Sequence, residues 1–128
     1  VRVNYDTGNA WYYSKGAINP VAELEQIAQI VAHVHVKTPQ VVDGLMRWVA
    51  LGEGALVLPG ICRVLREWLP SIPVSFELSP RQRSRDFEPR WRAPEVPGLS
   101  EIRGIIDRSL KALRTALVES EAVARDCD

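Results

Sequence analysis

The stretch VAHVHV, residues 31–36, decides how the rest of the chain is interpreted. It is short and rich in β-branched residues, which is typical of a buried strand. Two further runs have the same character, VRVNY at residues 1–5 and IPVSFEL at residues 72–78. A segment with helical spacing of apolar residues follows each run. The resulting order β-α-β-α-β-α predicts an α/β fold whose parallel strands are joined by right-handed crossovers.

The three expected helices have recognisable ends. Asn19 can cap the first, with Pro20 at its first position. The second has apolar residues at helical spacing from 58 to 68 and ends before Pro70. A long loop is expected over residues 79–98, after which Ser100 caps the third helix. We expect that helix to fray, which leaves a folded part over residues 1–118 and a polar tail over residues 119–128.

Three strands cannot close a barrel, and they leave two open edges. The alternation therefore suits a piece of a (β/α)8 barrel, which typically needs about 250 residues. A small doubly wound sheet is the alternative interpretation. Because the chain already alternates like a strand at Val1, we expect that the amino-terminal part of a larger protein is missing.

Composition narrows the functional classes. The 128 residues are 46% hydrophobic and 25% charged, as in ordinary globular domains. Sixteen basic and sixteen acidic side chains cancel, which argues against a nucleic-acid binder. No apolar run approaches the length of a membrane span. Cys62 and Cys127 lie far apart and form neither a metal-site spacing nor a disulfide framework, so we expect a cytoplasmic protein.

Metal-competent residues stand at the carboxyl ends of all three strands, where the chemistry of parallel α/β folds collects. These are Asp6, His35 and Glu77. Two carboxylates and an imidazole suit Mn²⁺, Mg²⁺, Co²⁺ or Zn²⁺. Taken singly, the Asp could cap a turn and the His could be a core residue, whereas a buried Glu is costly. Jointly they predict one metal site. We expect His33, the better candidate for a core histidine, to point away from it.

Other residues lie near the same edge of the sheet. Asn9 and Lys37, with Trp11 nearby, are expected to line the open side of the metal site and to contact the substrate, although Trp11 could equally pack there. The LGEG loop at 51–54 allows close approach of a ligand or is simply flexible. The arginines between residues 81 and 92 favour a solvated loop over a phosphate site, because acidic residues interleave with them.

Four motifs together resemble one known family. YDTGNA (5–10), HVHVK (33–37), LGEG (51–54) and VSFEL (74–78) occur in the order and at the distances found in the carboxyl-terminal part of sugar phosphate isomerases/epimerases, the xylose-isomerase-like barrels. The resemblance covers residues 1–80 well, and RSLKALR (108–114) resembles the last barrel helix more loosely. It implies that this chain forms the sixth, seventh and eighth βα units of a TIM barrel.

The resemblance also implies a site. Asp6, His35 and Glu77 match three ligands of a divalent metal, and a fourth, a Glu, would come from the absent part of the barrel. Asn9 matches a position where several members have a substrate-contacting His, and Lys37 matches a common Lys. Thr38 stands where an Asp often follows that Lys.

The implied reaction is a proton transfer next to the carbonyl of a sugar or sugar phosphate, through a metal-stabilised enediolate, with Glu77 as ligand and as acid or base. Dehydratases of cyclic polyols or keto acids share the scaffold. A non-catalytic fragment is a further alternative, and residues 1–128 alone are expected to be inactive and to self-associate. Zinc-dependent repair of abasic DNA, known among relatives of this barrel family, needs more histidines than this chain has, and zero net charge disfavours it.

Overall fold

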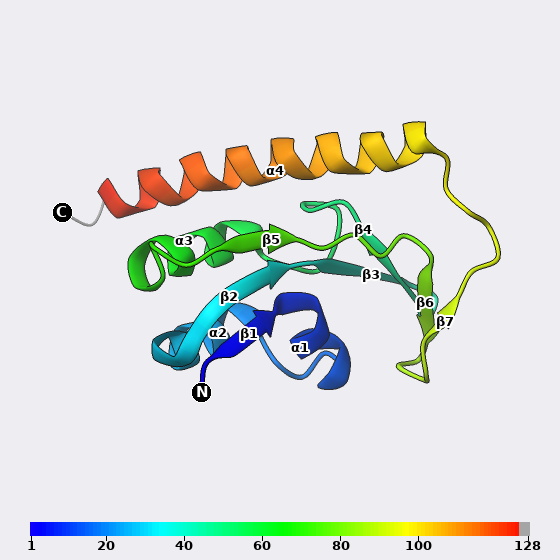
Figure 1. Cartoon of the computed structure of the whole chain (residues 1–128), viewed down its shortest axis with the longest axis horizontal. Coiled ribbons are helices and arrows are strands. Elements are labelled where there is room, and N and C mark those ends of the chain that lie inside the picture. Colours follow the sequence, from blue (N-terminus) through cyan, green and yellow to red (C-terminus); the bar gives the residue numbers. More distant parts are fainter. Residues whose placement is uncertain (126–128) are drawn as a thin grey trace.

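The structure is a computed structural model that describes residues 1–125, with side chains described up to residue 120 (Figure 1). Its elements, in chain order, are β1 (Val3–Asp6), α1 (Thr7–Tyr13), α2 (Pro20–Ile27), the 3₁₀ turn η1 (Ala28–Ile30), β2 (Val31–Val36), β3 (Thr38–Val42), β4 (Leu45–Val49), α3 (Leu58–Trp68), β5 (Val74–Phe76), β6 (Gln82–Arg85), β7 (Trp91–Arg92) and α4 (Leu99–Arg125).

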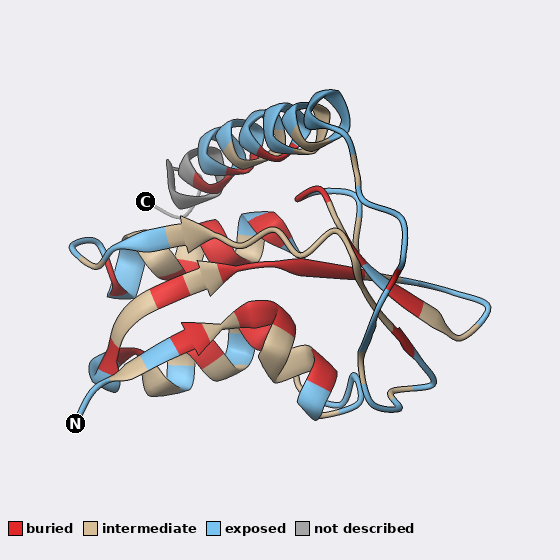
Figure 2. Cartoon of the chain, turned by 45° about the vertical axis from the view of Figure 1, so that its right-hand side comes forward, coloured by how far each residue is buried: buried red, intermediate tan, exposed pale blue. Residues whose placement is uncertain are grey.

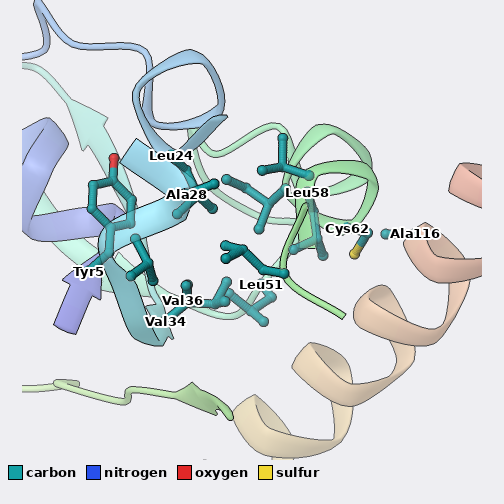
Figure 3. Packing of buried hydrophobic residues seen from close by; sticks show 13 residues of the cluster. Tyr5, Leu24, Ala28, Val34, Val36, Leu51, Leu58, Cys62 and Ala116 are labelled. Atoms are coloured by element: carbon teal, nitrogen blue, oxygen red, sulfur yellow. The ribbon is translucent and has the colours of Figure 1, made fainter. Parts of the chain in front are cut away.

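Strands β1, β2 and β5 form a parallel sheet in the order β1-β2-β5, so the predicted α/β fold with parallel strands is confirmed. One face of this sheet packs against α2 and α3. Val34 and Val36 of β2 share a buried cluster there with Leu24 of α2 and Ile61 of α3 (Figure 3). Because successive strand residues point to opposite faces, the other face carries the alternate, polar residues. These are Asn4, Asp6, His33, His35 and Ser75.

The expected helix boundaries are largely confirmed. The Asn19 side chain accepts a hydrogen bond from the amide of Val21, and Pro20 begins α2. Helix α3 ends at Trp68, two residues before Pro70. Ser100 is not a cap, because α4 already begins at Leu99. Helix α1, which follows β1 without a loop, was not predicted from the sequence.

Helix α4 lies along α3 and reaches from one end of the molecule to the other (Figure 1). Its fully buried residues are small, namely Ser109, Ala116 and Ser120, and the Ser109 hydroxyl accepts a hydrogen bond from the amide of Leu51. Its outer face is solvent-exposed (Figure 2). The expected tail over residues 119–128 is wrong as far as the structure describes it, because α4 continues to Arg125; the Ala and Glu residues of this segment favour a helix. Residues 126–128, with Cys127, lie outside the described residues.

A second sheet, which the sequence analysis missed, stands at the carboxyl ends of the parallel strands. It is antiparallel, in the order β3-β4-β6-β7. Strands β3 and β4 form a hairpin that turns at Asp43 and Gly44, both with positive φ. Strands β6 and β7 occupy the segment 79–98 that was expected to be a loop. Arg83, Arg85 and Arg92 therefore belong to a sheet, which corrects the expected solvated loop, whereas Arg81 and Arg90 lie beside these strands.

Among the described residues, no helix combines the length and the apolar character needed to cross a lipid bilayer.

Cys62 is buried in the main cluster with a free thiol. Burial raises the pKa of that thiol, as expected for a cysteine that serves packing.

Candidate metal centre

Three metal-competent side chains meet at the carboxyl end of the parallel sheet. Asp6 ends β1, His35 lies near the end of β2, and Glu77 directly follows β5. One ligand atom from each lies within 4.8 Å of the others, and all three residues are half-buried. Nδ1 of His35 is 3.4 Å from Oε2 of Glu77. The predicted convergence of these residues is therefore confirmed as geometry.

The orientation of Asp6 is fixed by helix α1. Asp6 caps this helix, and its Oδ1 accepts a hydrogen bond of 2.7 Å from the amide of Asn9. Its Oδ2 accepts a second bond, of 2.9 Å, from the Asn9 side-chain amide. Asn9 thus holds a candidate ligand through both of its nitrogens. The structure therefore places Asn9 against the Asp6 carboxylate, whereas the sequence predicted that Asn9 contacts the substrate.

Lys37 is buried among the candidate ligands, with only 2% of its surface exposed. Its ammonium donates to Oε1 of Glu77 at 2.7 Å and lies 3.7 Å from Oδ2 of Asp6. The backbone of Lys37 is fixed by Thr7, whose hydroxyl accepts from the Lys37 amide and donates to the Lys37 carbonyl. The single positive charge of Lys37 therefore offsets part of the negative charge of the two carboxyl groups. Thr7 was not among the site residues predicted from the sequence.

The two carboxyl groups titrate differently because their surroundings differ. Burial raises the pKa of Glu77, but the hydrogen bond and ion pair with Lys37 outweigh it and lower the pKa to about 2. Burial also raises the pKa of Asp6, and the nearby charge of Glu77 adds to the increase against the opposing effects of Asn9 and Lys37. Glu77 is thus ionised at neutral pH and available as a ligand.

The expected orientation of His33 is wrong. Residues separated by one position in a strand point to the same face, so His33 lies beside His35. Their rings are 4.7 Å apart in an edge-to-face arrangement. Nε2 of His33 is hydrogen-bonded to the hydroxyl of Ser75 at 2.8 Å. The polar face of the sheet therefore carries further polar groups next to the candidate ligands, namely His33 and Ser75.

Trp11 belongs to a separate apolar cluster between α1 and the antiparallel sheet. Its ring packs against Phe87 with centroids 5.2 Å apart, and Tyr12, Met46 and Trp48 complete the cluster. The structure therefore does not bring Trp11 to the metal ligands, and the packing alternative describes it better.

In the LGEG loop, Gly54 lies against Thr38 and Pro39 so closely that a Cβ atom would clash with their oxygens.

The donor set fits a divalent cation. Carboxylate and imidazole groups are the ligands that Mn²⁺, Co²⁺ and Zn²⁺ accept in proteins, and Mg²⁺ takes the carboxylates. The hydrogen bonds of Asn9 to Asp6 supply the outer support that metal ligands usually have.

No model of a known protein family matches the chain, and a search of curated proteins finds no match either.

Proposed function

We propose that this chain is the carboxyl-terminal part of a xylose-isomerase-like (β/α)8 barrel. The strand order β1-β2-β5 supports this, since successive strands are neighbours and both crossover helices pack on one face of the sheet. A doubly wound sheet would carry helices on both faces. The polar face also supports it, because Asn4 is exposed and His33 and Ser75 are only half-buried, whereas parallel sheets are normally covered on both sides.

The function that we propose is divalent-metal-dependent isomerisation or epimerisation of a sugar or sugar phosphate. Asp6, His35 and Glu77 would hold the metal, which supplies stabilisation of negative charge on a sugar oxygen. Lys37 keeps Glu77 ionised and fixed, so that Glu77 serves better as a ligand than as a base, because efficient bases have a pKa near the working pH. The proton acceptor would then come from the rest of the barrel.

One observation carries the proposal. Three ligand-competent side chains from three adjacent parallel strands lie within 4.8 Å of one another at the carboxyl end of the sheet. In barrels this end is the catalytic one. The three residues lie up to 71 positions apart in the chain. Each of them lies in, or directly after, a different strand.

Calorimetric titration of the chelator-treated chain with Mn²⁺ and Co²⁺ tests the proposed metal site. We expect one site per chain, and we expect His35→Ala and Glu77→Gln to abolish it. Glu67→Gln, on the exposed surface of α3, is the matched control and should bind as the wild type does. Equal binding by the His35 and Glu77 variants would contradict the site. Sugar turnover is expected only when the missing strands are supplied.

A further inference from the structure

We propose that Arg90 is a positioning residue for the metal site, acting on Asp6 through Asn9. The inference rests on the proposed metal site, because it concerns the orientation of one of its three ligands. It adds to that site a residue from the antiparallel sheet region, 84 positions away from Asp6 in the chain.

Arg90 reaches from the segment between β6 and β7 onto helix α1. Nη1 of Arg90 donates to Oδ1 of Asn9 at 3.3 Å, and Nη2 donates to the hydroxyl of Tyr13. The guanidinium also lies 5.0 Å from the ring centre of Tyr12 and 5.2 Å from that of Tyr13. Two hydrogen bonds and two aromatic faces therefore fix its position.

The segment that carries Arg90 is itself fastened to α1. The hydroxyl of Tyr12 donates to the carbonyl of Glu88 at 2.8 Å, and the hydroxyl of Ser84 donates to the same carbonyl at 2.7 Å. Phe87 packs against the ring of Trp11. The residues that directly precede Arg90 are thus fastened to the helix that Asp6 caps.

Asn9 links Arg90 to Asp6 because its side-chain amide has a donor end and an acceptor end. Its Nδ2 donates to Oδ2 of Asp6, and its Oδ1 accepts from Arg90. A positively charged donor at Oδ1 selects this orientation of the amide over the flipped one. The flipped amide would present its oxygen to the Asp6 carboxylate and repel it. Arg90 therefore determines which end of Asn9 meets the candidate ligand.

Other arginines of the same region serve the sheet itself. Nε of Arg81 donates to the carbonyl of Ala93, and Arg83 donates to the carbonyl of Pro80. Arg90 differs from these two because its bonds cross to α1. Arg81 therefore provides a matched control: its loss weakens the same sheet but leaves Asn9 untouched.

The test measures Co²⁺ affinity and the visible absorption bands of bound Co²⁺, which report the arrangement of its ligands. Arg90→Met keeps an unbranched aliphatic side chain and removes the guanidinium with its hydrogen bonds and ring contacts. Outer residues of metal sites typically contribute a factor of about 10 to 100 in affinity. We expect Asn9→Ala to weaken Co²⁺ binding by about tenfold and Arg90→Met, one step further out, by about threefold. Both should shift the absorption bands, and Arg90→Lys should restore part of the affinity.

A double-mutant cycle separates positioning from a structural role. In the Asn9→Ala background, Arg90→Met should cause no further loss of affinity, because the two residues act in series. Arg81→Met should lower the melting temperature and leave affinity and spectrum unchanged. Additive losses, or unchanged binding and spectrum in a folded Arg90→Met chain, would overturn the inference. If Arg90→Met does not fold, Arg90→Lys decides by the same criterion of affinity and spectrum. A wild-type chain that binds no Co²⁺ would refute the proposed metal site instead.

Discussion

The ammonium group of Lys37 lies 4.4 Å from the ring centre of Trp48, on a side chain that is almost fully buried. A buried ammonium loses its hydration, and the aromatic face together with the Glu77 carboxylate replaces it. Trp48 comes from β4 of the antiparallel sheet, whereas Lys37 directly follows β2 of the parallel one. This contact therefore joins the two sheets at the candidate metal centre.

Removal of the Lys37 charge should have opposite effects on stability and on metal affinity. In Lys37→Met, Glu77 loses its ion pair, and the metal-free chain should lose about 2 kcal/mol of unfolding free energy. Mn²⁺ should bind at least about tenfold more tightly, since a unit positive charge some 4 Å from a divalent cation opposes its binding by about 2 kcal/mol or more. Urea unfolding with chelator and Mn²⁺ titration measure the two effects. Lys111→Met, on the exposed face of α4, should change neither. Weaker Mn²⁺ binding in Lys37→Met would contradict this account.

Gly8 should resist substitution because it provides the room in which Trp48 approaches Lys37. A Cβ atom at this position would lie 2.6 Å from the Trp48 ring and 3.0 Å from the Lys37 carbonyl oxygen. Gly8→Ala should therefore cost about 2 kcal/mol and alter tryptophan fluorescence. Gly104→Ala in helix α4, where a Cβ would meet only the end of the Arg108 side chain, should instead stabilise the chain by up to about 1 kcal/mol. Equal effects of the two substitutions would argue against the steric explanation.

The low pKa of Glu77 predicts how the stability of the metal-free chain depends on pH. The folded pKa of about 2 lies below the ordinary value of 4.5, so the unfolded chain takes up this proton first. The stabilising contribution of Glu77 is therefore present above pH 4.5 and is lost as the pH falls toward 2. Denaturant unfolding of the wild type and Glu77→Gln should differ most above pH 4.5, and the difference should shrink in acid. A difference that stays constant between pH 6 and about 2.5 would exclude this linkage.

Self-association of the isolated chain should depend on α4. The polar face of the parallel sheet exposes few apolar groups, whereas α4 exposes Leu110 and Leu117 with 43% and 44% of their surfaces. Exposed apolar stripes of this kind favour association. Sedimentation velocity should show concentration-dependent oligomers, which Leu110→Lys combined with Leu117→Lys converts to monomers without loss of folding. A wild-type chain that stays monomeric, unfolds cooperatively and turns over sugars would mean that the chain works alone.

The parallel half of the fold could be predicted because β-branched residues dominate its central strand and apolar residues at helical spacing mark the helix α3. VAHVHV at 31–36 is a strand within the predicted bounds, and α3 occupies residues 58–68 as expected. The antiparallel sheet could not be recognised in the same way. Strand β6, QRSR, has no apolar residues, and only its pairing with β4 and β7 makes it a strand. The Asp43–Gly44 turn was the available signal, since Asp-Gly between apolar runs favours a hairpin.

The candidate ligands could be predicted because strand ends of one parallel sheet meet at one edge. Their supporting residues could not, because these depend on contacts between distant segments. Lys37 and Asn9 were identified, but the structure places both against the carboxylates of the ligands. Trp48 and Arg90 reach the site only through the second sheet. His33 was misplaced by an error of periodicity, which the spacing of two residues could have corrected.

The pairing of β4 with β6 has a consequence for the order of folding. Leu45 is paired with Arg85, so the antiparallel sheet can be completed only after α3 and β5, which lie between them in the chain, have been synthesised. Contacts between segments so far apart in sequence form late, because a long loop must close first. Until then the β3–β4 hairpin carries an unpaired edge, which is prone to join the edge of another chain. We therefore expect the nascent chain to be most prone to aggregation in the interval between the synthesis of β4 and that of β6.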